Sequence, residues 1–142
     1  MDELNGIISL LNITAESYKK TVSEELSTCG VTMRQWQVLK CLCREDNIPL
    51  RTLAKRLNIK SPTVVGVVRR MNLKGLITLA GSRTDRRLKR IRLSARGRDL
   101  LVTCTACVQR VELKVDSCLS DAEVAQLLSV LRKLRCNLES RV

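Results

Sequence analysis

The sequence predicts a mainly α-helical protein with a small β-hairpin, and three features support this. Apolar residues recur at helical spacing over most of the 142 residues, as in amphipathic helices. Within residues 76–93 the pattern changes to the alternation of apolar and polar residues that is typical of strands. Glycine, proline and N-capping residues separate these segments. A chain of this length can bury a core as one domain.

The N-terminal part contains two predicted helices. The first spans about residues 4–28, and Gly30 is its expected left-handed C-cap. Thr32 and Gln35 have the spacing of a capping box, which begins a second helix that runs to about Arg44. Residues 46–49 are expected to break the helical pattern.

Two short helices then follow, at residues 50–57 and 61–74. In the second, we expect Ser61 to be the N-cap and Pro62 to occupy the first helical position. Short helices joined by a tight turn are typical of a helix-turn-helix. Two strands, 76–80 and 89–93, flank a basic tip at residues 81–88. A hairpin directly after a helix-turn-helix is a wing, so the predicted architecture is a winged helix-turn-helix.

The C-terminal part is helical again. Ser94 begins a long helix to about Ser117, and a capping box of Ser120 and Glu123 begins the last one. The outer helices have apolar stripes and no sheet to cover, so packing against a second subunit is the economical arrangement, with a monomeric bundle as the alternative. We therefore expect residues 1–30 and 94–142 to form a helical dimerisation region, and residues 31–93 a winged helix-turn-helix DNA-binding domain.

The charge distribution predicts the partner. The net charge is +12, and the segment Arg51–Arg98 holds 15 basic residues and one acidic one. A basic balance alone is compatible with nucleic acid, an anionic membrane or an acidic protein. Because the excess lies in one third of the chain, it favours nucleic acid. With Tyr18 and Trp36 as the only aromatic residues, stacking on single strands or RNA is disfavoured, so the expected partner is double-stranded DNA.

Several function classes are excluded or disfavoured. No stretch is long and apolar enough to span a membrane, and we expect no membrane partner and a cytoplasmic location. Seven cysteines without a secretion signal favour reduced thiols. Histidine is absent, so a metal site would need three or four converging thiolates. We expect no metal, no cofactor, no catalytic residues and no enzyme activity.

The cysteines differ in their expected roles. Small buried side chains are expected where cysteines lie on apolar stripes, at Cys43, Cys104 and Cys118. Cys104 and Cys107 have the spacing of a redox pair, which motivates a thiol redox enzyme as an alternative, but they lie inside a helix, away from the N-terminus that favours thiolates. Cys29 is expected to be the most accessible thiol, and Cys136 to be exposed or at an interface.

Several motifs together resemble the MarR (multiple antibiotic resistance regulator) family over nearly the whole chain. They are Val31-Thr32-x-x-Gln35-Trp36-x-Val38-Leu39, Leu53-Ala54-x-x-Leu57-x-Ile59, Ser61-x-Thr63-Val64, Lys74-Gly75-Leu76-Ile77, Asp85-x-Arg87 and Leu93-Ser94-x-x-Gly97. The wing string, in register with the rest, is the most specific of these. The resemblance implies a homodimeric DNA-binding transcriptional regulator, usually a repressor of a pseudo-palindromic operator that a small molecule or thiol oxidation releases.

The helix at residues 61–74 is the expected recognition helix, with Val64, Val68 and Met71 facing inward. Thr63 and Val65 could read base edges, whereas Arg69 and Arg70 lie later and favour phosphate. By resemblance, Arg87 enters a minor groove and Asp85 orients it. The DNA-binding candidates are Arg51, Lys60, Ser61, Pro62, Thr63, Val65, Gly66, Arg69, Arg70, Arg83, Asp85, Arg86 and Arg87, with Lys55 as a further phosphate contact.

By resemblance, an effector site for a small aromatic or phenolic ligand lies between the dimerisation helices and the winged domain. The effector or redox candidates are Tyr18, Cys29, Trp36, Cys41 and Cys136, although packing in the core explains Tyr18 and Trp36 as well. One further alternative is a weakly specific architectural DNA-binding protein, because the recognition helix has few hydrogen-bonding side chains.

Overall fold

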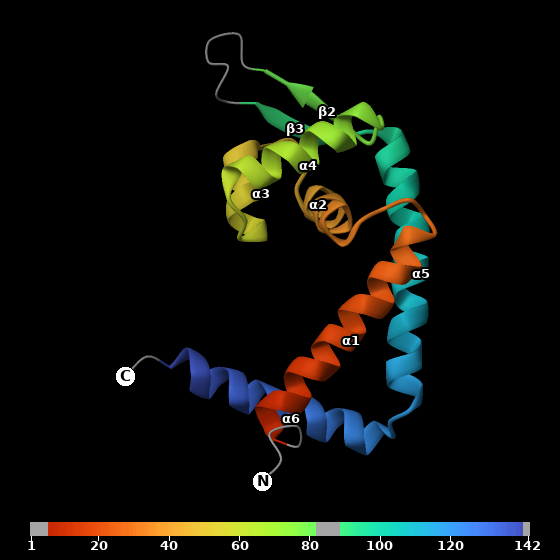
Figure 1. Cartoon of the computed structure of the whole chain (residues 1–142), viewed down its shortest axis with the longest axis vertical. Helices are drawn as coiled ribbons and strands as arrows, with labels where there is room; N and C mark the ends of the chain where they lie inside the picture. The colour runs from red at the N-terminus through yellow and green to blue at the C-terminus, as the bar shows by residue number, and fades with distance from the viewer. Residues whose placement is uncertain (1–5, 82–88, 141–142) are drawn as a thin grey trace. The chain divides into compact units, whose positions relative to one another are not determined.

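The computed structural model describes residues 6–81 and 89–140, and it shows the predicted order of elements around a small sheet (Figure 1). The helices are α1 (Ile7–Ser27), α2 (Met33–Arg44), α3 (Leu50–Leu57), α4 (Ser61–Leu73), α5 (Ala95–Ser117) and α6 (Asp121–Glu139). The strands are β1 (Ile48–Pro49), β2 (Ile77–Ala80) and β3 (Arg90–Leu93). The chain divides into two compact units, residues 1–108 and 109–142, and each is described by itself.

The sheet has three antiparallel strands in the order β1-β3-β2, one more than the predicted hairpin. Ile91 of β3 lies opposite both Ile48 of β1 and Leu79 of β2. The sequence did not reveal β1 because two residues are too short for an alternating pattern, and one of them is proline. Pro49 fits an edge strand because it has no N–H to donate to a neighbour.

The core of the first unit lies among α2, α3, α4 and the sheet. Leu39 of α2, Leu53 of α3 and Met71 of α4 are fully buried there, together with Ile91 of β3. The hairpin β2–β3 lies alongside α4, and α2 is enclosed by α3, α4 and the sheet (Figure 1). The helix-turn-helix is therefore held on one side by the wing strands and on the other by α2.

The N-terminus of α4 differs from its prediction by one residue. Lys60, not Ser61, is the N-cap, and the backbone carbonyl of Lys60 accepts hydrogen bonds from the amides of Thr63 and Val64 at 3.0 and 3.2 Å. Pro62 fits this position because its fixed φ suits either of the first helical residues and its missing N–H is not needed there. The expected Ser61 side-chain cap is therefore wrong.

Two of the three cysteines expected to be buried are exposed. Cys104 is buried, but Cys43 and Cys118 are exposed, and Cys107 is buried instead. Cys43 lies on the same side of α2 as Trp36 and Leu39, but it is the second-last residue of the helix, where the burial of that side ends. Cys118 follows the end of α5, in the second unit.

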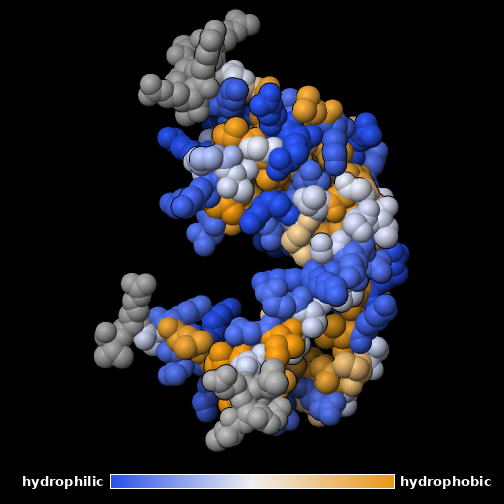
Figure 2. All heavy atoms as spheres, in the orientation of Figure 1, coloured by the Kyte–Doolittle hydropathy of each residue, from blue (hydrophilic) through white to orange (hydrophobic). Residues whose placement is uncertain are grey.

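The second unit has an apolar surface that its own residues do not cover. None of the residues of α6 is buried, and Leu113 and Val115 of α5 are exposed as well. Figure 2 shows apolar side chains along the visible surface of α6. In the first unit, the N-terminal half of α1 has the same character, since Ile7, Ile8 and Leu10 are more than half exposed.

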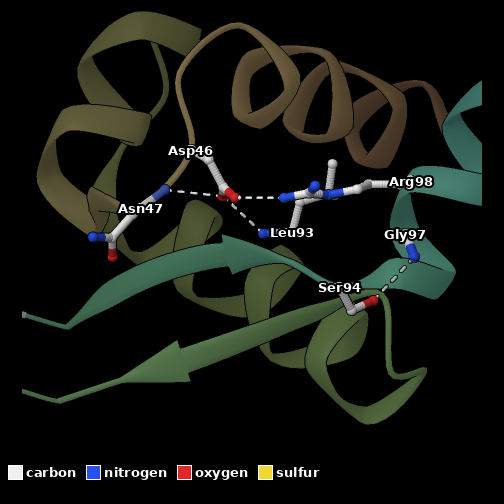
Figure 3. Close-up of polar contacts among 6 residues, drawn as sticks. All are labelled: Asp46, Asn47, Leu93, Ser94, Gly97 and Arg98. Carbon is white, nitrogen blue, oxygen red and sulfur yellow. Dashed lines mark hydrogen bonds and ion pairs between the residues drawn. The ribbon is translucent and has the colours of Figure 1, made fainter.

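The helix α5 begins in close contact with the chain that follows α4. The Ser94 hydroxyl donates to the carbonyl of Gly75 at 2.7 Å. It also accepts from the amide of Gly97 at 3.0 Å (Figure 3). The amide of Ser94 donates to the carbonyl of Leu76 at 3.1 Å. A Cβ atom on Gly97 would lie 2.1 Å from that same Leu76 oxygen. Only glycine lets the first turn of α5 approach this backbone so closely.

Asp46 connects the loop after α2 to the end of β3 and to α5. One carboxylate oxygen accepts from the amides of Asn47 and Leu93, both at 2.9 Å, and the other pairs with the Arg98 guanidinium at 3.0 Å (Figure 3). Burial alone would raise the pKa of Asp46, but the two backbone hydrogen bonds and Arg98 outweigh it and hold the pKa below its ordinary value. The charged form is therefore the one that the fold stabilises.

We expect opposite effects of alanine at two helical glycines. Gly97→Ala should lower the free energy of unfolding by roughly 1–3 kcal/mol or abolish folding, because its methyl group meets a backbone oxygen that cannot move away. Gly66→Ala on α4 is the matched control: its Cβ would approach only the Arg70 guanidinium, at 3.9 Å, so a gain of up to ~1 kcal/mol is expected. Urea denaturation measures both, and equal effects would refute the close contact.

Asp46→Asn should reduce the acid sensitivity of the fold. A carboxylate whose pKa is lowered on folding contributes stability that is present above its unfolded pKa and lost as the pH falls through its folded pKa. The free energy of unfolding of the wild type should therefore fall more than that of Asp46→Asn when the pH drops from about 5 to about 2. Arg98→Gln, which removes one of the partners, should lie between them. Parallel pH profiles for wild type and Asp46→Asn would contradict this role.

Candidate nucleic-acid interface

The outward side of α4 presents the residues predicted to meet DNA. Val64, Val67, Val68 and Met71 are buried and hold one face of the helix against the core. The opposite face carries the exposed candidates Ser61, Pro62, Thr63, Val65, Arg69 and Arg70, with Gly66 half-buried. The pattern of 3.6 residues per turn explains this division. Their contact with DNA stays a prediction.

A shallow groove lies beside this face, between α4 and the sheet. Val65, Arg69 and Asn72 of α4 line it, together with Leu79 of β2 and Lys89 just before β3, and its volume is about 370 Å³. The groove thus combines an apolar floor with basic side chains. Val65, which is 47% exposed, is an apolar side chain that the fold leaves at the surface.

Basic side chains of the same segment are also exposed on other elements. They include Arg51 and Lys55 on α3 and Lys60 in the turn before α4, whose role as phosphate contacts stays a prediction. On β3, Arg90 and Arg92 are exposed while Ile91 and Leu93 are buried. The predicted alternation along this strand is therefore confirmed, and it directs basic side chains away from the core.

Some of these positive charges are used within the fold. Arg56 pairs with Glu45, and Arg98 pairs with Asp46 at 3.0 Å. The Arg90 guanidinium donates to the carbonyl of Asn47 at 2.7 Å. These contacts connect the loop after α2 to the helix-turn-helix, the wing strand and α5. None of these three arginines is among the DNA-binding candidates.

The tip of the wing lies outside the described residues. It contains four DNA-binding candidates, namely Arg83, Asp85, Arg86 and Arg87. The described parts of β2 and β3 pair in register from Ile77 opposite Leu93 to Ala80 opposite Arg90. The sheet therefore fixes where the tip leaves the domain and returns to it.

The five effector or redox candidates do not share one cavity. Trp36 is buried, with the Lys40 ammonium 5.2 Å from its ring centroid, which favours the core interpretation. Cys41 lines a cavity of about 540 Å³ with the basic side chains of Lys40, Arg44 and Arg56. Cys29 lines a different cavity, of about 590 Å³, near the end of α4 and the start of α5. Tyr18 on α1 and Cys136 on α6 are exposed. Cys29 is only partly exposed, whereas Cys43, Cys118 and Cys136 are exposed, so the expectation that Cys29 is the most accessible thiol is wrong.

Asp46 is the residue of this region whose role the sequence did not reveal. Residues 46–49 were predicted only as a break between helices. The local signal is an aspartate before Asn47, which has a positive φ of 56°, as in turns where a short polar side chain accepts a backbone N–H. Its link to Leu93 joins residues 47 positions apart, which local patterns do not show.

The described residues contain neither a metal-binding cluster nor a membrane-spanning helix. In residues 6–81 and 89–140, no group of three cysteine, aspartate or glutamate side chains is arranged to hold a metal ion. No helix in the part of the chain that the structure describes is long and apolar enough to cross a membrane.

This arrangement is similar to that of known proteins. Residues 31–89 match the model of the MarR family. The structure of MepR from S. aureus in complex with DNA is 26% identical, with a TM-score of 0.80 over 94% of this chain and 98% of that one. MarR from E. coli in its apo form is 22% identical, with a TM-score of 0.79 over 94% and 98% of the two chains. CouR from Rhodococcus jostii, bound to p-coumaroyl-CoA, is 23% identical, with a TM-score of 0.76 over 100% and 99%.

The likeness to the last two shows the fold alone, whereas the family model covers the helix-turn-helix and the wing as far as the residue before β3. Its match runs from Val31, before α2, to Lys89, before β3. Residues 31–89 are therefore a MarR-family domain, in a chain that has the fold of MarR-family transcriptional regulators.

Proposed function

We propose that this chain is a homodimeric repressor that binds a pseudo-palindromic operator in double-stranded DNA. The observation that carries the proposal is the outward face of α4, which the MarR-family domain presents beside exposed basic residues of α3, the turn and β3. A helix of this kind fits the major groove of B-DNA. The structure of MepR with DNA, 26% identical to this chain, supports the same assignment.

Each part of the face has a proposed role. Thr63 offers a hydroxyl and a methyl group, and Val65 offers an apolar contact for a thymine methyl. Arg69 and Arg70, later on α4, contact phosphates, as do Arg51 and Lys60. At the wing, Arg87 enters the adjacent minor groove and Asp85 orients it, a role that rests on the resemblance of the wing string to the family.

The outer helices supply the dimer. We assign residues 1–30 and 94–142 to dimerisation and residues 31–93 to DNA binding. The exposed apolar side chains of α1 and α6 support this, because a monomer would leave them in water, and their burial against a second copy is worth about 25 cal/mol per Å². The twofold axis of such a dimer would place two α4 helices on two half-sites of the operator.

A small anionic ligand is the proposed release signal. The cavity at Cys41 has a volume of about 540 Å³, within the range of small-molecule sites, and the basic side chains of Lys40, Arg44 and Arg56 line it. Those charges suit a carboxylate, and Leu57 adds an apolar wall for an aromatic ring. A ligand bound between α2 and α3 would act on the helix-turn-helix directly.

A weakly specific architectural protein remains the second candidate. The observation that favours it is the composition of the outward face of α4, where Pro62, Val65 and Gly66 offer no hydrogen bonds to base edges. The two functions differ in the ratio of operator to random-DNA affinity. A ratio of a few-fold indicates coating of DNA, whereas a ratio of roughly a thousandfold or more indicates regulation.

We expect specific DNA binding with a steep salt dependence. Genomic fragments that the protein enriches should share a pseudo-palindrome. The logarithm of the binding constant for this sequence should fall with the logarithm of the salt concentration at a slope of roughly −7 to −11, because a dimer would neutralise about 8–12 phosphates. Arg69→Gln with Arg70→Gln should make the slope shallower by about 2–4. Binding titrations between low and physiological salt measure this.

The control for that experiment removes equal charge elsewhere. Lys114→Gln with Lys133→Gln changes exposed residues of α5 and α6, outside the basic segment, and should leave the slope unchanged. A wild-type slope shallower than about −3 would mean that the basic face does not meet the duplex. Equal slopes for the two variants would remove α4 from the interface.

The protein should sediment as a dimer at micromolar concentration without DNA. Leu127→Glu with Leu131→Glu, on the exposed apolar surface of α6, should shift it towards monomer because carboxylates are costly to bury. The matched control, Glu123→Gln with Arg132→Gln, changes polar side chains of the same helix and should leave the dimer intact. A monomeric wild type, with and without operator DNA, would contradict the assembly.

A further inference from the structure

Two cysteines far apart in the sequence meet in the first unit. Cys29 lies in the turn after α1 and Cys107 lies on α5, and their sulfur atoms are 3.5 Å apart. A sulfur–sulfur distance of this size is a non-bonded contact and is much longer than the roughly 2.05 Å of a disulfide. The two thiols are therefore reduced in this structure and already adjacent.

The turn holds Cys29 in place through the backbone. The amide of Cys29 donates to the carbonyl of Leu26 at 3.0 Å, and that carbonyl also accepts from Val31 at 3.2 Å. Gly30 closes the turn with a φ of +72°, and its carbonyl accepts from the Lys74 ammonium at 3.2 Å. Cys107 sits in the middle of α5, so both sulfur atoms are carried by ordered backbone.

The two thiols differ in accessibility. Cys29 is partly exposed and lines the cavity of about 590 Å³ that Lys74, Arg96 and Thr103 also line. Cys107 is 5% exposed. A small oxidant therefore reaches Cys29 first, and Cys107 is the neighbour that can react with what forms there.

Cys104 lies one turn before Cys107 and takes a different part. It is fully buried, and burial raises the pKa of its thiol to about 12, with smaller contributions from Cys29 and Cys107. Cys104 therefore stays protonated at neutral pH, and a protonated thiol is a poor nucleophile. Cys104 also hydrogen-bonds Cys29, so the three thiols form one cluster. We assign Cys107 as the partner for Cys29 because their sulfur atoms are 3.5 Å apart.

We propose that Cys29 and Cys107 form a reversible intramolecular disulfide on reaction with a hydroperoxide. The Cys29 thiolate attacks the peroxide oxygen, the O–O bond breaks, and Cys29 becomes a sulfenic acid while water leaves. Cys107 sulfur then attacks the Cys29 sulfur, the S–O bond breaks, and a second water leaves. In sum, two thiols and one hydrogen peroxide give one disulfide and two waters, and a dithiol reductant reverses the change.

The bond would enclose the whole helix-turn-helix and wing. Residues 30–106 contain α2, α3, α4 and all three strands. To form the bond, the two sulfur atoms need to approach by about 1.5 Å. The disulfide would reduce the conformational entropy of the unfolded chain. Oxidation would therefore stabilise the folded domain.

The test uses a full-length variant in which Cys41, Cys43, Cys118 and Cys136 are serine, which leaves only the three clustered thiols. After treatment with one equivalent of hydrogen peroxide and alkylation, a tryptic digest should contain residues 21–34 joined to residues 99–110. Fragmentation should place the alkyl group on Cys104. Dithiothreitol should abolish the joined peptide, and the thermal midpoint should be higher in the oxidised protein by about 5–15 °C.

Two variants in the same background make the result decisive. Cys107→Ala should prevent the joined peptide and leave a Cys29 sulfenic acid that dimedone traps. Cys104→Ala, the matched control on the same helix face, should retain the Cys29–Cys107 peptide. A bond from Cys29 to Cys104, or alkylation of both Cys29 and Cys107 after peroxide has been consumed, would overturn the proposal. None of these measurements depends on DNA binding, so they test this proposal independently of the proposed function.

Discussion

The structure of the first unit depends on the close approach of α5 to the chain segment after α4. Gly97 faces the Leu76 carbonyl at a distance that no Cβ atom permits, and Ser94 joins the same place through Gly75 and Leu76. Gly75 itself has a φ of +73°, which turns the chain from α4 into β2. These contacts therefore fix where α4 ends, where β2 begins and how α5 starts after β3. This also gives a physical reason for the glycines in the two family strings 74–77 and 93–97.

Asp46 connects the loop after α2 to the contacts between α5 and the end of α4. It binds the amide of Leu93, one residue before Ser94, and it pairs with Arg98, one residue after Gly97. The loop after α2 is thus connected to the same strand end that anchors α5. These contacts lower the pKa of the Asp46 carboxylate, so its charged form stabilises the fold. The loop after α2 and the start of α5 are consequently held at the same end of β3.

Local patterns predicted the elements well because each carries its own signal. The capping boxes at Thr32 and Ser120 are present as predicted, and the buried face of α4 contains Val64, Val68 and Met71. The errors come from features that local sequence does not encode. The strand β1 exists because β3 offers a free edge, and Cys107 is buried because Cys29 and its turn pack against it. For the candidate site, helical periodicity was enough to identify the outward residues of α4, but the partners of Asp46 and the separation of Cys29 from Cys41 depend on the tertiary fold.

The outward face of α4 also limits how the protein can be specific. Ser61 and Thr63 are the hydroxyl-bearing side chains near its start, whereas Val65 and Gly66 offer no hydrogen bonds. Basic residues supply affinity without discriminating between sequences, since phosphates are the same at every position. In the proposed complex, selectivity would arise from the few contacts of α4, from wing contacts in the minor groove, and from the spacing that a dimer imposes on two half-sites. A twofold assembly would double the number of contacts from each source. The apolar helices proposed to form the dimer would therefore be as important for sequence recognition as the helix proposed to touch the bases.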